Sequence, residues 1–145
     1  WQAGWRDDAD ELNHPVPQLA QQLTAAGYDG KSVIVGSDHM VAAMLRSHFP
    51  QAYAMACNPG FSKMDACMAA ARSKATQLGT GLLVVARMDK APADWWQAAL
   101  PAIATTPPTQ QPLQPQSLHI PYLRMSAATP PLHYQFVWSP APVTP

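Results

Sequence analysis

The chain has 145 residues, of which 48% are hydrophobic and 12% are charged, and its formal net charge is zero. This length fits one domain with a buried core, and the charge balance argues against a nucleic-acid-binding surface, which needs a basic stripe. The longest apolar runs are well short of the roughly 18 residues of a membrane span, and the acidic residues near the start argue against a secretory signal there.

The first part of the chain predicts a helix, a strand and a second helix after a polar leader at residues 1–14. Residues 15–27 carry leucines at helical spacing and end at a glycine. Residues 31–37 (KSVIVGS) have three β-branched residues between turn signals, which is typical of a buried strand. Residues 38–48 return to helical spacing, and Pro50 ends that helix.

The middle of the chain repeats this alternation. A weak strand is predicted at 51–56, an alanine-rich helix at 64–77 and a strong strand at 81–88. A helix at 91–100 is expected to stop before Pro101. It contains the adjacent Trp95 and Trp96, of which we expect one to enter the core and the other to face an edge or solvent.

Proline dominates the rest of the chain, because 12 of its 16 prolines follow residue 90. Residues 105–116 (TTPPTQQPLQPQ) are uncharged and have one large apolar residue, so we expect an extended surface loop. Strands are predicted at 117–125 and 132–138, the second with alternating apolar positions, and the two could form an antiparallel hairpin. We expect a disordered tail at 140–145.

This order of elements predicts the fold class. Helices alternate with strands and a strand pair follows, which indicates a small α/β sandwich with a mainly parallel central sheet, flanking helices and an antiparallel C-terminal strand pair. The domain should span residues 15–139.

The candidate ligand site is the turn after the first strand, Ser37-Asp38-His39. If that strand is central, the turn lies at the carboxyl end of the sheet, where open α/β folds bind ligands. Asp38 or Ser37 would equally serve as the N-cap of the next helix. Both readings fit the residue types.

Cys57 and Cys67 are the two cysteines of the chain. They fit either a disulfide, if the strand end and the helix approach closely enough, or two buried free thiols. Apolar neighbours of Cys67 at helical spacing favour the thiols. The two cysteines and five scattered histidines have no metal-ligand spacing, and nucleotide-binding glycine motifs are absent, so we expect no metal and no cofactor.

A succession of motifs resembles a known family. The segments PQLAQQLTAAG, GKSVIVGSDHMVAAMLRSHFPQAYAMACN, SKMDACM, GLLVVARMDKAPADWW and HYQFVW occur in this order over residues 16–139. Together they resemble the carboxyl-terminal soluble domain of bacterial polytopic membrane glycosyltransferases, the relatives of dolichyl-phosphate-mannose protein mannosyltransferases and of the lipid A aminoarabinose transferase.

The resemblance implies a periplasmic domain of an inner-membrane enzyme that transfers a sugar from a polyprenyl-phosphate donor. The catalytic acidic residues of such enzymes lie in the membrane domain, so no residue of this chain inherits a catalytic role. The motifs add Asn58 and Asp65 to the turn residues as candidate ligand contacts. The implied partners are the membrane domain of the same polypeptide and a glycan, a lipid-linked sugar or a protein acceptor. We expect the chain to be a piece of such a protein.

Two other classes of function stay open. An independent small-molecule-binding α/β module would use the Ser37-Asp38-His39 turn and needs a concave pocket beside it. A stand-alone hydrolase or transferase would need a nucleophile and a base within about 3 Å of each other, and no arrangement in the sequence requires such a pair.

Overall fold

The computed structural model describes residues 16–60, 63–103, 114–120 and 132–141. The helices are α2 (Val16–Ala25), α3 (His39–His48), α4 (Met64–Leu78) and α5 (Trp95–Ile103). The strands are β1 (Val33–Gly36), β2 (Ala54–Ala56), β3 (Leu82–Arg87), β4 (Gln116–Ile120) and β5 (Leu132–Ser139). The predicted leader lies outside the described residues, as do most of the predicted proline-rich loop and tail.

The strands form one five-stranded sheet in the order β2-β1-β3-β5-β4. β2, β1 and β3 are parallel, whereas β5 runs antiparallel to both of its neighbours. The chain is therefore a small α/β sandwich with a mainly parallel core and an antiparallel C-terminal pair, and the predicted fold class is confirmed.

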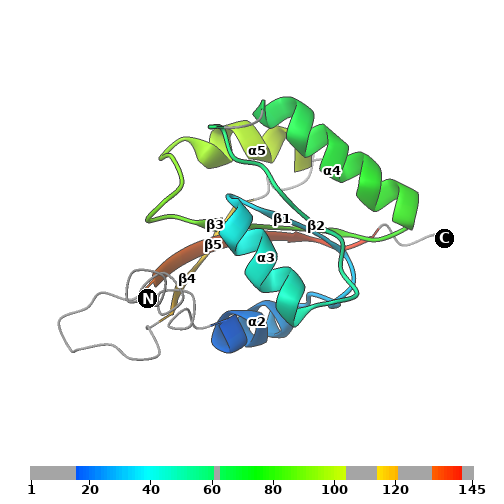
Figure 1. The fold of residues 1–145 in the computed structure, drawn as a ribbon, viewed down its shortest axis with the longest axis vertical. Coiled ribbons are helices and arrows are strands. Elements are labelled where there is room, and N and C mark those ends of the chain that lie inside the picture. The colour runs from blue at the N-terminus through cyan, green and yellow to red at the C-terminus, as the bar shows by residue number, and fades with distance from the viewer. Residues whose placement is uncertain (1–15, 61–62, 104–113, 121–131, 142–145) are drawn as a thin grey trace, which may run out of the picture.

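Helices cover both faces of the sheet, with α4 and α5 on one side and α2 and α3 on the other (Figure 1). Alternate residues of the central strands point to opposite faces of the sheet, so each set packs in one of two hydrophobic cores. Leu82, Val84 and Ala86 of β3 pack beneath α4 and α5, and Leu83 and Val85 pack against the helices of the other side. Because both faces are covered, β1 and β3 read as continuous apolar runs rather than as alternating patterns.

The alternation predicted for the last strand is confirmed. Tyr134 and Phe136 of β5 are buried on the α2–α3 side, with Trp138 packed against the same core. Val137 is buried on the opposite side, beneath α4 and α5.

Helix α5 departs from its predicted form in three ways, the first of which is that it begins at Trp95 rather than at residue 91. Trp95 and Trp96 are both buried, at 1% and 7% exposed, so the expectation that one would face an edge or solvent is wrong. Their rings meet edge to face at 5.0 Å, which lets neighbouring positions share one core. The helix also runs through Pro101 and ends at Ile103. Pro101 lies in the last turn, where its missing N–H costs a single helical hydrogen bond.

Cys57 and Cys67 form a disulfide, with their Cα atoms 5.7 Å apart. The prediction of two free thiols is therefore wrong. Met68, Ala71 and Ala75 make up the buried face of α4, and Cys67 lies at the flank of that face, half-buried, rather than in its centre. The flank faces the end of β2, where Cys57 is fully buried.

Candidate functional site

The parallel strands β1, β2 and β3 end at the same edge of the sheet, which is where α/β folds place ligands. From this edge β1 leads into α3 on one face, and β3 leads towards α5 on the other (Figure 1). The connections that follow β1 and β3 therefore leave the sheet towards opposite faces, and a gap between them is expected at this point. Such a switch point is the place to look first for a site.

Ser37 occupies this point, but its hydroxyl already has a structural partner. The side chain is 4% exposed, and its Oγ accepts a hydrogen bond from the backbone N–H of Arg87 at 3.0 Å. The backbone N–H of Ser37 donates to the carbonyl of Val85 at 3.0 Å. Ser37 therefore ties the end of β1 to the end of β3.

Asp38 is the N-cap of α3. Its backbone is extended, and its Oδ1 accepts a hydrogen bond from the N–H of Val41 at 2.9 Å. Gly36 lets the helix start this close to the strand, because a Cβ there would lie 2.7 Å from the backbone nitrogen of Ala42. The capping role predicted for Asp38 as one of two readings is confirmed.

His39 lies apart from these two residues. Its side chain is exposed and lines a hollow of about 390 Å³ between α3 and the edge strand β2. The other walls come from Arg46, from Met55 and from alanines of both elements. Ser37 and Asp38 do not line this hollow, so the structure does not bring the three residues of the turn together around one cavity.

Asn58 and Asp65 also accept hydrogen bonds from backbone groups close to them in the sequence. Asn58 accepts the N–H of Gly60 at 3.0 Å, which closes an Asx turn after β2. Asp65 is exposed in the first turn of α4 and accepts the N–H of Ala66 at 2.8 Å. A carboxylate at this place also suits the positive end of the helix dipole.

The sequence did not predict the ion pair that lies beside Ser37. Arg87, at the end of β3, is 3% exposed, and its Nε donates to both carboxylate oxygens of Asp89 at 2.9 and 3.0 Å. The guanidinium also lies 3.8 Å from the sulfur of Met40 in α3. The available signal was the place of Arg87 at the end of the apolar run of β3, all of whose residues are buried.

A second polar cluster joins the start of β1 to the start of β3. Ser32 donates from Oγ to Asp29 at 2.7 Å and accepts at Oγ from the N–H of Gly81 at 3.0 Å. The Tyr28 hydroxyl donates to the carbonyl of Ser32 at 2.8 Å.

Two pKa values in this cluster depart from their ordinary range. Burial, and then the charge of Asp29, raise the pKa of the Tyr28 phenol well above its usual value. Burial acts to raise the pKa of Asp29 as well, but the hydrogen bonds from Ser32 and Lys31 outweigh it and bring that pKa below its usual value. Both shifts keep the groups in their ordinary charge states near neutral pH, as suits a structural turn.

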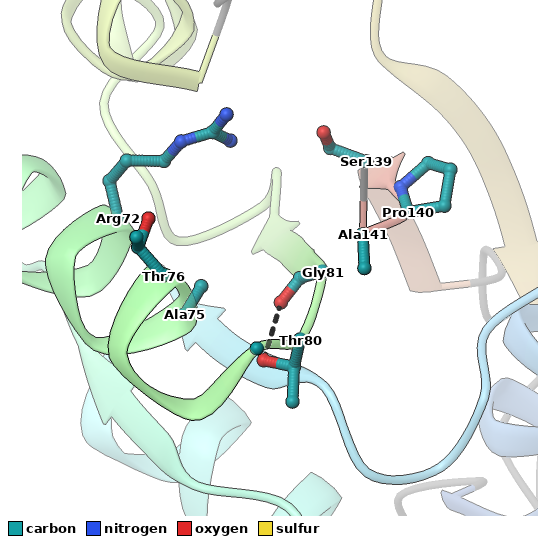
Figure 2. Close-up of a pocket in the computed structure, with 9 residues that line it drawn as sticks. Arg72, Ala75, Thr76, Thr80, Gly81, Ser139, Pro140 and Ala141 are labelled. Atoms are coloured by element: carbon teal, nitrogen blue, oxygen red, sulfur yellow. Dashed lines mark hydrogen bonds between the residues drawn. The ribbon is translucent and has the colours of Figure 1, made fainter. Parts of the chain in front are cut away.

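A hollow of about 290 Å³ opens at the opposite edge of the sheet, where β1 and β3 begin. It lies between the end of α4, the start of β3 and the end of β5 (Figure 2). Its polar side chains are Arg72, Thr76, Thr80 and Ser139. Figure 2 shows Arg72 and Ser139 on either side of the opening. The lining residues supply hydrogen bonds and one positive charge, but they include no carboxylate or imidazole that would act as a general base.

Within the described ranges, no group of three or more His, Cys, Asp or Glu side chains could hold a metal ion. None of the helices in that part of the chain is long and apolar enough to span a bilayer.

Comparison of the chain with models of known protein families, with curated proteins and with solved structures gave no match.

Proposed function

We propose that the chain is an accessory domain on the periplasmic face of a bacterial membrane glycosyltransferase, whose membrane portion transfers a sugar from a polyprenyl-phosphate donor. The proposal starts from the motif succession of residues 16–139. The observation that carries it beyond the sequence is the disulfide between Cys57 and Cys67. Structural disulfides form and persist in oxidising compartments, and the bacterial periplasm is one of them.

The domain itself is proposed to be non-catalytic. Ser37, Asp38 and Asn58 each accept a backbone hydrogen bond within the fold. If any of these side chains turned towards a substrate to act as a nucleophile or base, it would lose the backbone hydrogen bond that stabilises its turn. Their residue types are accounted for by the architecture, which leaves the domain to support the membrane portion or to contact an acceptor.

Compartment and attachment are tested with antibodies raised against the chain, used on cells of its source. We expect the antigen in the inner-membrane fraction, on a polypeptide much longer than 145 residues. In spheroplasts with intact inner membranes, added protease should remove it. A soluble antigen in the cytosol, protected from protease until lysis, would refute the proposal.

Chemistry is tested with a radiolabelled polyprenyl-phosphate sugar. The isolated chain should show no transfer to acceptor or water, while membranes that contain the full polypeptide should show turnover. Turnover by the isolated chain would overturn the non-catalytic assignment and leave the compartment result standing.

One observation favours a second candidate, an independent small-molecule-binding module. His39 lines the hollow beside β2, and Arg46 gives that hollow a positive charge. A screen of small anions against the chain and its His39→Ala variant separates the two functions. Saturable binding that the variant abolishes, together with a soluble antigen, would favour the binding module.

A further inference from the structure

We infer that His119 and His133 form a two-imidazole site for a divalent transition-metal ion on the exposed face of the β4–β5 pair. The inference does not depend on the proposed function. It starts from the register of the two strands, in which His119 and His133 are directly opposite each other. Their rings are stacked, with centroids 4.4 Å apart and planes 12° from parallel.

The backbone pattern explains why the rings lie so close. The carbonyl of His133 accepts a hydrogen bond from the N–H of Met88, which directly follows β3 and so lies on the side of β5 away from β4. In an antiparallel sheet both polar backbone groups of a residue point to the same neighbour, so His133 faces β4 as a non-hydrogen-bonded pair. Pairs of this kind have the shorter Cα separation, about 4.5 Å, and the closer side chains.

The two rings are open to solvent. His133 and Gln135 share the face of β5 that carries Val137 into the core, but the contacts of α4 with the sheet go to β1 and β3. Among the described residues, the outer part of this face is open: Ser117 is exposed and Gln135 is half-buried. His119 is exposed and His133 half-exposed, so an ion can reach both rings and keep water in its remaining positions.

Neighbouring polar groups orient one ring. The Nε2 atom of His133 lies 3.2 Å from Oγ of Ser117, and Gln135 donates to the same oxygen at 3.1 Å. When Nε2 carries the proton, it donates to Ser117 and leaves the lone pair on Nδ1. A metal-bound histidine commonly has this arrangement, with its other ring nitrogen held by a polar partner.

The ligand set selects the ion. Two neutral imidazoles suit Cu²⁺, Ni²⁺ and Zn²⁺, whereas Mg²⁺ and Ca²⁺ prefer oxygen ligands. Metal–nitrogen bonds of about 2.0–2.1 Å require the two donor atoms to lie closer together than the present ring centroids. Small rotations about the side-chain bonds of two solvent-facing residues achieve this without moving the strands.

The test titrates Cu²⁺, Zn²⁺ and Mg²⁺ separately into the chain by calorimetry. We expect one Cu²⁺ or Zn²⁺ bound per chain and no saturable binding of Mg²⁺. His119→Gln and His133→Gln should each weaken Cu²⁺ binding by about tenfold or more. His48→Gln is the matched control, because His48 is an exposed histidine on α3 and away from the pair, and it should bind Cu²⁺ as the unaltered chain does.

An NMR measurement keeps the test independent of the variants. Substoichiometric Cu²⁺ should broaden the ring signals of His119 and His133 before those of His39 and His48. Equal broadening of all four, or Cu²⁺ affinity unchanged in both pair variants, would overturn the site. Far-ultraviolet circular dichroism of each variant checks that the fold persists.

Discussion

Asp38 illustrates how a residue type common in catalysis is used by the backbone at its own position. Its carboxylate accepts one hydrogen bond from the first turn of α3. Nearby, the hydroxyl of Ser37 is turned inward to the N–H of Arg87. Both side chains thus satisfy backbone donors that would otherwise be left without partners at a helix start and a strand end.

Replacing the cap should cost stability. We expect Asp38→Ala to lower the free energy of unfolding by about 1 kcal/mol, because the N–H of Val41 loses its acceptor. Asp65→Ala is the control, since that carboxylate is exposed and accepts only from the adjacent residue, and it should cost less. Urea denaturation of both variants measures the difference. Equal stability of Asp38→Ala and the unaltered chain would show that the cap contributes nothing.

The two buried tryptophans offer a matched pair. Trp95 donates from Nε1 to the carbonyl of Cys57 at 3.0 Å, whereas the Nε1 of Trp96 is buried and has no hydrogen-bond partner in the described part of the chain. Substitution by phenylalanine removes similar volume in each case. We therefore expect Trp95→Phe to destabilise the fold by about 1 kcal/mol more than Trp96→Phe, because it also strands a buried carbonyl. Thermal melts that place Trp96→Phe lower would contradict this.

The turn at Asp29 should make stability depend on pH. Its pKa is lower in the folded chain than its ordinary value. Its contribution is therefore present above the unfolded pKa, near 3.9, and is lost as pH falls through the folded value. We expect Asp29→Asn to cost on the order of 1 kcal/mol at pH 7, kept small by solvent exposure.

The difference in unfolding free energy between Asp29→Asn and the unaltered chain should shrink below about pH 4. Chemical denaturation at pH 7, 5 and 3 measures it. Asp94→Asn is the control, since Asp94 is an exposed aspartate just before α5, and its effect should be small at every pH. A gap for Asp29→Asn that stays constant with pH would contradict the account.

At the scale of elements, the disulfide fastens the start of α4 to the end of β2 across a sequence separation of 10 residues. A loop of this size predicts a stabilisation of about 2–3 kcal/mol. We expect no titratable thiol in denatured, unreduced protein and two after reduction. The double variant Cys57→Ser/Cys67→Ser should melt at a lower temperature than the oxidised chain. Two thiols in the unreduced sample would contradict the bridge.

Element boundaries followed the sequence where one strong local signal existed. Gly79, with a positive φ of 69°, ends α4 one residue after the predicted end of the helix. The failures came from tertiary contacts. Pro101 is tolerated because it lies in the last turn of α5, and Cys67 lies beside the apolar face of its helix rather than within it. The spacing of apolar residues alone does not show whether a position such as Cys67 lies at the centre or at the flank of the buried helix face.

At the scale of the whole molecule, β3 is the longest of the described strands that is buried along its entire length. All six of its residues are buried, and it is paired on both sides. β2 and β4 lie at the edges of the sheet. We expect amide hydrogen exchange to be slowest in β3 and several orders of magnitude faster in β2 and β4, because edge strands open without unfolding the core. Protection in β2 equal to that in β3 would contradict this.

The class of fold was predictable because its elements alternate along the chain and each carries its own periodicity. The candidate site was predictable only in its location at the strand ends. The sequence did not reveal that Ser37 bonds to a residue 50 positions away, nor that Arg87 is buried against Asp89. The first fact depends on the pairing of β1 with β3, and the second on the burial of the end of β3 in the folded sheet, which no local pattern encodes.

The position of β5 has a consequence for how the protein is made. Among the described strands β5 comes last in the sequence, yet it lies between β3 and β4. During synthesis, β4 emerges with no neighbour to pair with, and the long edge of β3 stays uncovered until β5 arrives. The described sheet is therefore completed when β5 inserts between β3 and β4, not by growth at its rim. A nascent chain that stalls before residue 132 would carry an open, apolar strand edge, the kind of surface that chaperones shield and that other chains add to.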